Sequence, residues 1–324
     1  MFERLNASAV REAAGRIAGH VQRTPLVVSP GLSRLAGGDV YLKLENQQTT
    51  GSFKLRGALN ALAALTPEKR ERGVVASSAG NHGMGVAHAA RALEMPAKIY
   101  VPSTAPQVKK DGIRELGAEL DDTQPDYDAA MVAAKEFGSA TSRQYINPCL
   151  GDALLAGQGT VALEIVEELP ALASLVVNVG GGGLLGGCGS LLRNERPDVK
   201  IYGAQSEKTA AMSRSLAAQR LVAIPSEPTL ADGLAGQIDA EALDIGVHAL
   251  DGIVTVTEAE IADAIAWLAR EHGQRVEGAG ACGVAAILTG KLKPETPTAV
   301  VISGGNIDAV RWSTIVEQSS QSSD

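Results

Sequence analysis

Apolar runs alternate with helical patterns along most of this 324-residue chain. Runs of the kind that form extended or buried strands lie at residues 40–45, 73–76, 97–101, 175–179 and 298–302. Small and apolar residues recur at helical spacing in residues 84–93, and helices are also predicted at residues 107–116 and 184–193. Strands that alternate with helices are typical of parallel sheets. The pattern therefore predicts an α/β fold whose open, twisted sheets carry helices on both faces.

One compact series of strands and helices fills residues 73–145. We expect this series to form a small domain, inserted into a large domain built from residues 1–72 and 146–324. Ligands of open α/β sheets bind beyond the carboxyl ends of the strands. The residues that follow the strands are therefore candidates for ligand contacts.

Lys54 lies among small residues in the segment 49–58 (TTGSFKLRGA), where an extended segment gives way to a helix. A lysine that is held on a rigid element and desolvated acts as a nucleophile and base near neutral pH. For an isolated lysine, a surface position in the first turn of a helix is the ordinary interpretation. Three polar turns elsewhere in the chain favour the chemical role.

The first of these turns is a run of four glycines at residues 180–183, between a strand and a helix. Such a loop curls tightly and points its N–H groups, with the helix N-terminus behind them, at an anion. No Gly-Lys-Ser/Thr follows, so the loop is not a P-loop. A flexible linker is disfavoured by the strand and helix on either side.

The other two turns also follow predicted strands. Residues 77–83 (SSAGNHG) combine serine, asparagine and histidine before a helix, and residues 303–306 (SGGN) follow the last strand. An ordinary helix cap and a simple turn serine are the alternatives for these segments taken singly. Residues 77–83 carry more polar groups than a cap requires, which favours ligand contacts. Residues 303–306 follow the carboxyl end of a strand, where ligands of open α/β sheets collect, and for this segment alone a simple turn serine stays an alternative.

Together these segments resemble the fold type II pyridoxal-phosphate enzymes, in the branch of the serine/threonine dehydratases and serine racemases. The resemblance runs from residues 23–26 (RTPL) through residues 43–46 (KLEN) and Lys54 to residues 303–306. The likeness to the short catabolic threonine dehydratases extends through residues 203–207 (GAQSE). It implies a fold like that of the tryptophan synthase β-subunit, with pyridoxal 5'-phosphate in the interdomain cleft.

The resemblance implies a role for each matching residue. Lys54 would hold the cofactor's aldehyde covalently and then remove the Cα proton of the substrate. Phe53 would pack near the pyridine ring, Asn81 would contact its phenolic oxygen, and Glu277 would lie near the ring. Ser303 would face the pyridine nitrogen. Because a hydroxyl does not keep that nitrogen protonated as a carboxylate does, Ser303 favours β-elimination over transamination.

Two further groups of residues follow from the same resemblance. The phosphate would be held by the glycine loop and the residue after it: Gly180, Gly181, Gly182, Gly183 and Leu184. The substrate carboxylate would bind to the serine–asparagine turn: Ser78, Ala79, Gly80, Asn81 and His82.

The implied reaction is the loss of water from a β-hydroxy amino acid, which gives a 2-oxo acid and ammonia. L-Threonine is the expected substrate and L-serine a secondary one; 3-hydroxyaspartate or another β-hydroxy amino acid is an alternative. Residues 125–131 contain no arginine for a second carboxylate, which disfavours 3-hydroxyaspartate. A catalytically silent, ligand-binding homologue is the alternative outside the enzymes.

Serine racemase is a further alternative, and residue 79 argues against it. Racemisation requires a second acid or base on the opposite face of the substrate carbon. In the serine racemases of this family a serine provides it, whereas this chain has Ala79, which has no proton to exchange. Ser78 matches the carboxylate-binding serine instead.

No divalent-metal site is expected, because the positions that carry acidic ligands in some relatives are Gln205 and Ala211 here. The net charge of -8 argues against a nucleic-acid binder. No apolar run is long enough to span a membrane, and the first five residues lack the apolar core of a signal peptide. With three cysteines and no C-x-x-C pair, we expect reduced thiols in a cytoplasmic protein. The resemblance implies a homodimer or higher homo-oligomer, without the regulatory domain of the biosynthetic enzymes.

Overall fold

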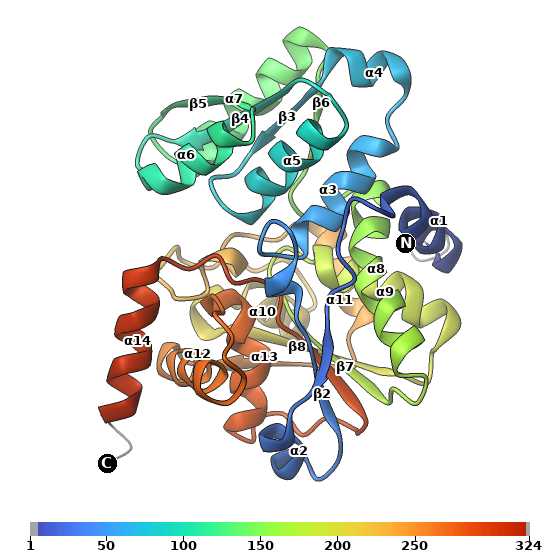
Figure 1. Cartoon of the computed structure of the whole chain (residues 1–324), viewed down its shortest axis with the longest axis vertical. Coiled ribbons are helices and arrows are strands. Elements are labelled where there is room, and N and C mark those ends of the chain that lie inside the picture. The colour runs from blue at the N-terminus through green and yellow to red at the C-terminus, as the bar shows by residue number, and fades with distance from the viewer. Residues whose placement is uncertain (1–5, 322–324) are drawn as a thin grey trace.

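The computed structural model describes residues 6–321, which form two α/β lobes, each built on its own sheet (Figure 1). Residues 1–5, on which the expected absence of a signal peptide partly depended, lie outside the described residues. Within the described part of the chain, no helix is long and apolar enough to cross a membrane.

The larger sheet has six strands in the order β1-β2-β10-β7-β8-β9. Its strands are β1 (Leu26–Val28), β2 (Val40–Lys43), β7 (Ser174–Asn178), β8 (Lys200–Ser206), β9 (Gly252–Val256) and β10 (Thr298–Val301). The edge strand β1 runs antiparallel to β2, and every other neighbouring pair is parallel. The parallel strands therefore present their carboxyl ends along one edge of the sheet.

The smaller sheet is fully parallel, with the order β5-β4-β3-β6. Its strands are β3 (Val74–Ser77), β4 (Ala97–Pro102), β5 (Glu119–Gln124) and β6 (Gln144–Tyr145). The helices of this lobe are α4 (Pro67–Arg72), α5 (Asn81–Ala92), α6 (Gln107–Glu115) and α7 (Tyr127–Thr141). All four strands fall within residues 73–145; the division into two domains that move relative to each other stays a prediction.

The larger lobe contains the remaining α-helices of the described chain. They are α1 (Ala7–Ile17), α2 (Pro30–Ala36), α3 (Lys54–Ala63), α8 (Asp152–Glu168), α9 (Gly183–Glu195), α10 (Ala211–Ala218), α11 (Ala240–Ala249), α12 (Glu258–His272), α13 (Gly278–Leu288) and α14 (Ala309–Gln321). Short 3₁₀ helices lie at η1 (Glu45–Gln47), η2 (Glu207–Thr209) and η3 (Asp232–Leu234).

Successive residues of the central strands pack on opposite sides of the larger sheet. Leu175 and Val177 of β7 belong to the core shared with α1, α3, α8 and α9, whereas Val176 belongs to the core shared with α12 and α13. Side chains of a strand alternate between the two faces of its sheet, so an all-apolar strand requires helices on both. The sequence prediction of open sheets with helices on both faces is confirmed.

Candidate active site

Neighbouring strands of the larger sheet bring the predicted cofactor residues to one edge. The segments after β2, β10 and β7, which are adjacent in the sheet, carry Lys54, Ser303 and the glycine loop respectively. The first two segments are joined directly, because Phe53 N donates to Ser303 O at 3.1 Å and Ser52 bridges to Gly304. The observed strand order therefore explains why residues 250 positions apart in the chain meet.

Lys54 is the first residue of α3, and its side chain is half-buried. Its Nζ donates to the carbonyl oxygen of Pro148 at 2.7 Å and lies 4.0 Å from Cys149 Sγ. The same ammonium is 5.3 Å from the centre of the Phe53 ring, within the range of a cation–π contact. Because Pro148 and Cys149 follow β6 of the smaller sheet, the amine lies where the two lobes meet.

The glycine loop has no space for side chains at its first two positions. A Cβ on Gly180 would lie 2.9 Å from Leu234 Cα, and one on Gly181 would lie 2.5 Å from Cys149 Sγ. Gly182 caps α9 with a φ of 89°, a left-handed conformation that favours glycine. The loop therefore places bare backbone N–H groups and the N-terminus of α9 beside Cys149, which suits an anion.

Asn81 and Glu277 are linked across the two lobes. Asn81, the first residue of α5, donates through Nδ2 to Glu277 Oε1 at 2.7 Å. Its Oδ1 accepts a 2.6 Å hydrogen bond from Asn306, whose Nδ2 also donates to Thr50 O at 2.8 Å. Burial, together with the nearby Asp232 charge, raises the pKa of Glu277 to about 7.

Ser303 is 4% exposed and is held by Asn178, the last residue of β7. Asn178 Nδ2 donates to Ser303 Oγ at 3.3 Å and to Val301 O at 3.0 Å, while its Oδ1 accepts from Gly283 N at 2.8 Å. The asparagine thus fixes the turn that follows β10, and with it the hydroxyl that the resemblance assigns to a pyridine nitrogen.

The serine–asparagine turn follows β3, and the helix begins at Asn81 rather than at the predicted residue 84. Ser78 Oγ accepts from Gly80 N at 3.1 Å, which closes the turn around Ala79. His82 is 3% exposed, and its Nε2 lies 3.0 Å from Ile146 O. Burial and the Lys54 charge lower the pKa of His82 to about 3, so the ring is neutral at ordinary pH. The predicted role of this turn in holding a substrate carboxylate stays a prediction.

Sequence reasoning missed several residues of the site, including Asn178, Asn306, Pro148 and Cys149. Asn306 ends the SGGN segment that was singled out, yet its contact with Asn81 depends on tertiary structure. Asn178 could have been noted as a polar residue at the end of an apolar strand. Pro148 and Cys149 lie 94 and 95 positions after Lys54, in a segment without an informative pattern.

Gln205 and Ala211, where some relatives carry acidic metal ligands, lie on β8 and α10 respectively. Gln205 is fully buried, and its amide group bonds only to backbone: Nε2 to Val179 O at 2.9 Å and Thr209 O at 3.0 Å, and Oε1 to Ser213 N at 3.0 Å. Within residues 6–321, no group of three or more His, Cys, Asp or Glu side chains could hold a metal ion. The expected absence of a divalent-metal site stays a prediction.

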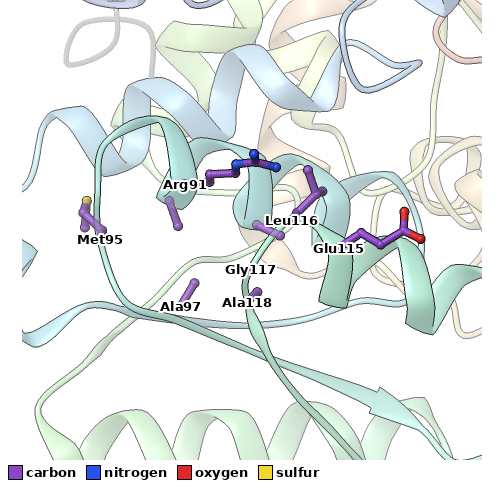
Figure 2. A pocket seen from close by; sticks show the side chains of 9 residues that line it. Arg91, Met95, Ala97, Glu115, Leu116, Gly117 and Ala118 are labelled. Carbon is purple, nitrogen blue, oxygen red and sulfur yellow. The ribbon is translucent and has the colours of Figure 1, made fainter.

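A separate hollow of about 180 Å³ lies in the smaller lobe, between the C-terminal end of α5 and the segment after α6 (Figure 2). Its lining includes Arg91, Met95 and Glu115. Arg91 lies ten residues along α5 from Asn81, which at 1.5 Å per residue is roughly 15 Å from the predicted site. This hollow is therefore distinct from the site around Lys54.

Comparison with known proteins identifies the family to which this geometry belongs. The family model of pyridoxal-phosphate-dependent enzymes matches residues 17–304. The chain belongs to this family. The cofactor of this enzyme is therefore pyridoxal phosphate, and the sequence prediction of that cofactor is confirmed.

Relatives within the family are also similar in sequence over most of the chain. The L-threonine ammonia-lyase of Thermotoga maritima is 43% identical over 300 residues, which cover 92% of this chain and 75% of the relative. The catabolic L-threonine dehydratase of Staphylococcus aureus is 36% identical over 314 residues, 95% of this chain and 91% of the relative.

Solved structures match nearly the whole fold. Maize serine racemase is 29% identical with a TM-score of 0.91, covering 98% of this chain and 99% of that one. Threonine deaminase isoform 2 of Solanum lycopersicum is 30% identical with a TM-score of 0.89, covering 98% of this chain and 90% of that one. The predicted fold type II architecture is confirmed.

The residues at the cleft fit this cofactor. Lys54 supplies an amine for its aldehyde, and Cys149 adjoins both that amine and the glycine loop. The loop and the N-terminus of α9 suit the phosphate, and the buried hydroxyl of Ser303 suits a ring nitrogen. The aldehyde, the phosphate and the ring nitrogen of the cofactor thus each have a protein group of suitable chemistry among these residues.

Proposed function

We propose that this chain is an L-threonine ammonia-lyase, which eliminates water from threonine to give a 2-oxo acid and ammonia, with L-serine as a secondary substrate. The observation that carries the proposal is the placement of the Lys54 amine beside the glycine loop in the cleft. The named activities of relatives that are 36–43% identical over more than nine-tenths of the chain support the substrate.

Lys54 and its neighbours would handle the proton at the substrate's Cα. Bound pyridoxal phosphate supplies an electron-withdrawing ring that weakens the bonds at this carbon. Lys54 Nζ would hold the cofactor in the absence of substrate and accept the Cα proton in its presence. The Pro148 carbonyl, 2.7 Å from Nζ, would orient the amine for this transfer.

Ser303 and Glu277 would set the electronic character of the site. A serine hydroxyl opposite the ring nitrogen does not hold a proton there as a carboxylate would, which favours rapid loss of the β-hydroxyl. Asn81 donates a 2.7 Å hydrogen bond to the carboxyl group of Glu277. The pKa of that carboxyl group is raised to about 7, so its charge changes near neutral pH. The serine–asparagine turn, with a neutral His82, would bind the substrate carboxylate through N–H and hydroxyl donors.

Residues 125–131 form the segment that would meet the second carboxylate of 3-hydroxyaspartate, and they contain no arginine or lysine. This segment forms the N-terminus of α7, where Asp126 caps the helix by accepting from Ala129 N at 2.8 Å. This arrangement disfavours 3-hydroxyaspartate. The similarity to maize serine racemase favours racemisation as the second candidate function, but Ala79 lacks the proton that the opposite face of the substrate requires.

The finer features of the proposal follow from the family rather than from any single contact. We propose a cytoplasmic homo-oligomer in which residues 73–145 form a domain that closes on the substrate. Closure would exclude water from the reacting carbon.

The test is 2-oxo acid release by the purified enzyme from L-threonine, L-serine and both diastereomers of 3-hydroxyaspartate. Threonine should be turned over most efficiently, and no D-serine should form from L-serine. A yellow, cofactor-loaded protein without turnover of any of these would support the silent homologue instead. Preferred release from 3-hydroxyaspartate, or formation of D-serine, would contradict the proposed activity.

Lys54→Ala should reduce turnover by about 10³-fold, because it removes both the covalent anchor and the base. Borohydride should fix the cofactor covalently to the wild-type protein and leave the variant unlabelled, as measured by mass spectrometry. Lys69→Ala, an exposed lysine on α4, is the matched control and should behave as wild type. Full turnover by Lys54→Ala would remove this residue from the mechanism.

A further inference from the structure

The Cys149 thiol stands between the two groups that would hold the cofactor. Its Sγ lies 4.0 Å from Lys54 Nζ on one side, and a Cβ on Gly181 would lie 2.5 Å from it on the other. The neighbouring Pro148 carbonyl receives the Lys54 hydrogen bond. The thiol therefore forms part of the wall of the cofactor site.

We propose that Cys149 is a modification site for small thiol-directed electrophiles that is reachable in the cofactor-free enzyme and covered by bound cofactor. Once modified, it would prevent the cofactor from binding. The inference depends on the family's cofactor and not on the proposed substrate, so a failure of the threonine assay would leave it standing.

The accessibility of the three cysteines differs sharply. Cys149 is partly exposed, whereas Cys188 and Cys282 are both fully buried. Burial raises the pKa of the Cys188 thiol to about 12 and that of Cys282 further still. Since the thiolate is the reactive form, both buried thiols should be inert in the folded protein.

The backbone around Cys149 keeps the sulfur in this position. Asn147 Oδ1 accepts from Cys149 N at 2.8 Å and from Leu150 N at 3.0 Å, which fixes the turn between β6 and α8. The Cys149 backbone also packs closely on the loop, because a Cβ on Gly183 would lie 3.1 Å from Cys149 O. The backbone that carries the sulfur is therefore fixed beside the glycine loop.

These contacts explain why an adduct would compete with the cofactor. Gly181 must lack a side chain to accommodate Sγ alone, so no spare room exists on that side of the sulfur. A group added to Sγ would extend along the Lys54 amine or across the glycine loop. Either direction takes space that the aldehyde end or the phosphate end of the cofactor requires.

The experiment compares cofactor-free and cofactor-loaded enzyme treated with iodoacetamide, whose iodide is displaced as the sulfur–carbon bond forms and the thiol proton passes to solvent. Peptide mass spectrometry should find the label on Cys149, at least about ten-fold faster in the cofactor-free protein. Visible absorbance should show that the labelled protein no longer takes up pyridoxal phosphate. Equal labelling rates in the two forms would overturn the proposal.

Two controls separate this effect from unfolding. Cys149→Ser, measured against its own cofactor uptake without reagent, should lose none of that uptake on iodoacetamide treatment. Methyl methanethiosulfonate adds a methylthio group to the thiol as a mixed disulfide and releases methanesulfinate. This adduct should block cofactor uptake, and a thiol reductant, which cleaves the disulfide, should restore it. Cofactor uptake by protein that is fully labelled with iodoacetamide would contradict a steric role for the adduct. So would a loss of uptake after methyl methanethiosulfonate treatment that reduction does not reverse.

Discussion

At the scale of single residues, the carboxyl group of Glu277 is the most informative titrating group of the site. It is buried, it accepts a hydrogen bond from Asn81, and its pKa is raised from 4.5 to about 7. Between these two pH values the folded, cofactor-free chain binds a proton at this position that the unfolded chain has released. The contribution of Glu277 to stability is therefore present below pH 4.5 and is lost as pH rises to about 7.

Glu277→Gln should remove this pH dependence from the cofactor-free protein. The free energy of unfolding of wild type should fall relative to the variant as pH rises from 4.5 to 7, with a slope of at most about 1.4 kcal/mol per pH unit. Urea denaturation across this range measures the difference, with the exposed Glu207→Gln as matched control. A constant difference between wild type and Glu277→Gln at every pH would contradict the raised pKa.

At the scale of elements, a buried cluster of charges anchors the helix that carries Lys54. Arg56 of α3 is fully buried and contacts both oxygens of Glu45 at 2.8 Å. It also contacts both oxygens of Glu164 on α8, at 2.6 and 3.0 Å, and Lys43 of β2 lies 2.7 Å from the same carboxylate. Strand β2, helix α3 and helix α8 are thus joined two residues from Lys54.

Arg56→Met should destabilise the protein by about 3–5 kcal/mol, because it leaves two buried carboxylates with too little positive charge. The midpoint of denaturant unfolding measures the effect. Arg11→Met is the matched control: its pair with Glu195, at 2.6 Å, is largely exposed and should contribute at most about 1 kcal/mol. Similar losses in the two variants would show that the buried cluster does not anchor α3.

Among the strands, those that form a continuous apolar run were the easiest to predict from the sequence. Strand β7 (Ser174–Asn178) is buried throughout and was evident as an apolar run. Strand β5 (Glu119–Gln124) was not predicted, because an edge strand of partly exposed, polar residues has no such pattern. Helix α5 begins before its first apolar residue, since Gly80 and Asn81 start it.

The residues of the candidate site could likewise be predicted only where a local sequence pattern marks them. The glycine loop, Lys54 and Ser303 follow strands and could be identified from local patterns. Cys149 could not, because its proximity to Lys54 arises from the position of β6 in the other sheet. Buried hydrogen-bond partners such as Asn178 likewise depend on which strands are neighbours, which local sequence does not determine.

At the scale of the whole molecule, the two lobes are joined by two chain crossings (Figure 1) and by side-chain contacts between them. One of these contacts pairs Lys109 Nζ of α6 with Asp232 Oδ2 of η3 at 3.7 Å. Both side chains are partly exposed, and Asp232 also lies close enough to Glu277 to affect its pKa. The pair therefore links the smaller lobe to the larger one near the predicted site.

If the smaller lobe closes on the substrate, this ion pair should favour the closed arrangement. An exposed pair contributes at most about 1 kcal/mol, so Lys109→Ala should raise KM by no more than about five-fold and leave the stability of each lobe intact. The double variant Lys109→Asp, Asp232→Lys should restore KM, whereas Lys293→Ala, which changes an exposed lysine of the larger lobe, should not alter it.

X-ray scattering should show a smaller radius of gyration for wild type with bound substrate, and a reduced change for Lys109→Ala. An unchanged radius of gyration in wild type would mean that the lobes do not close, and any KM effect of Lys109 would then require local contact with the substrate.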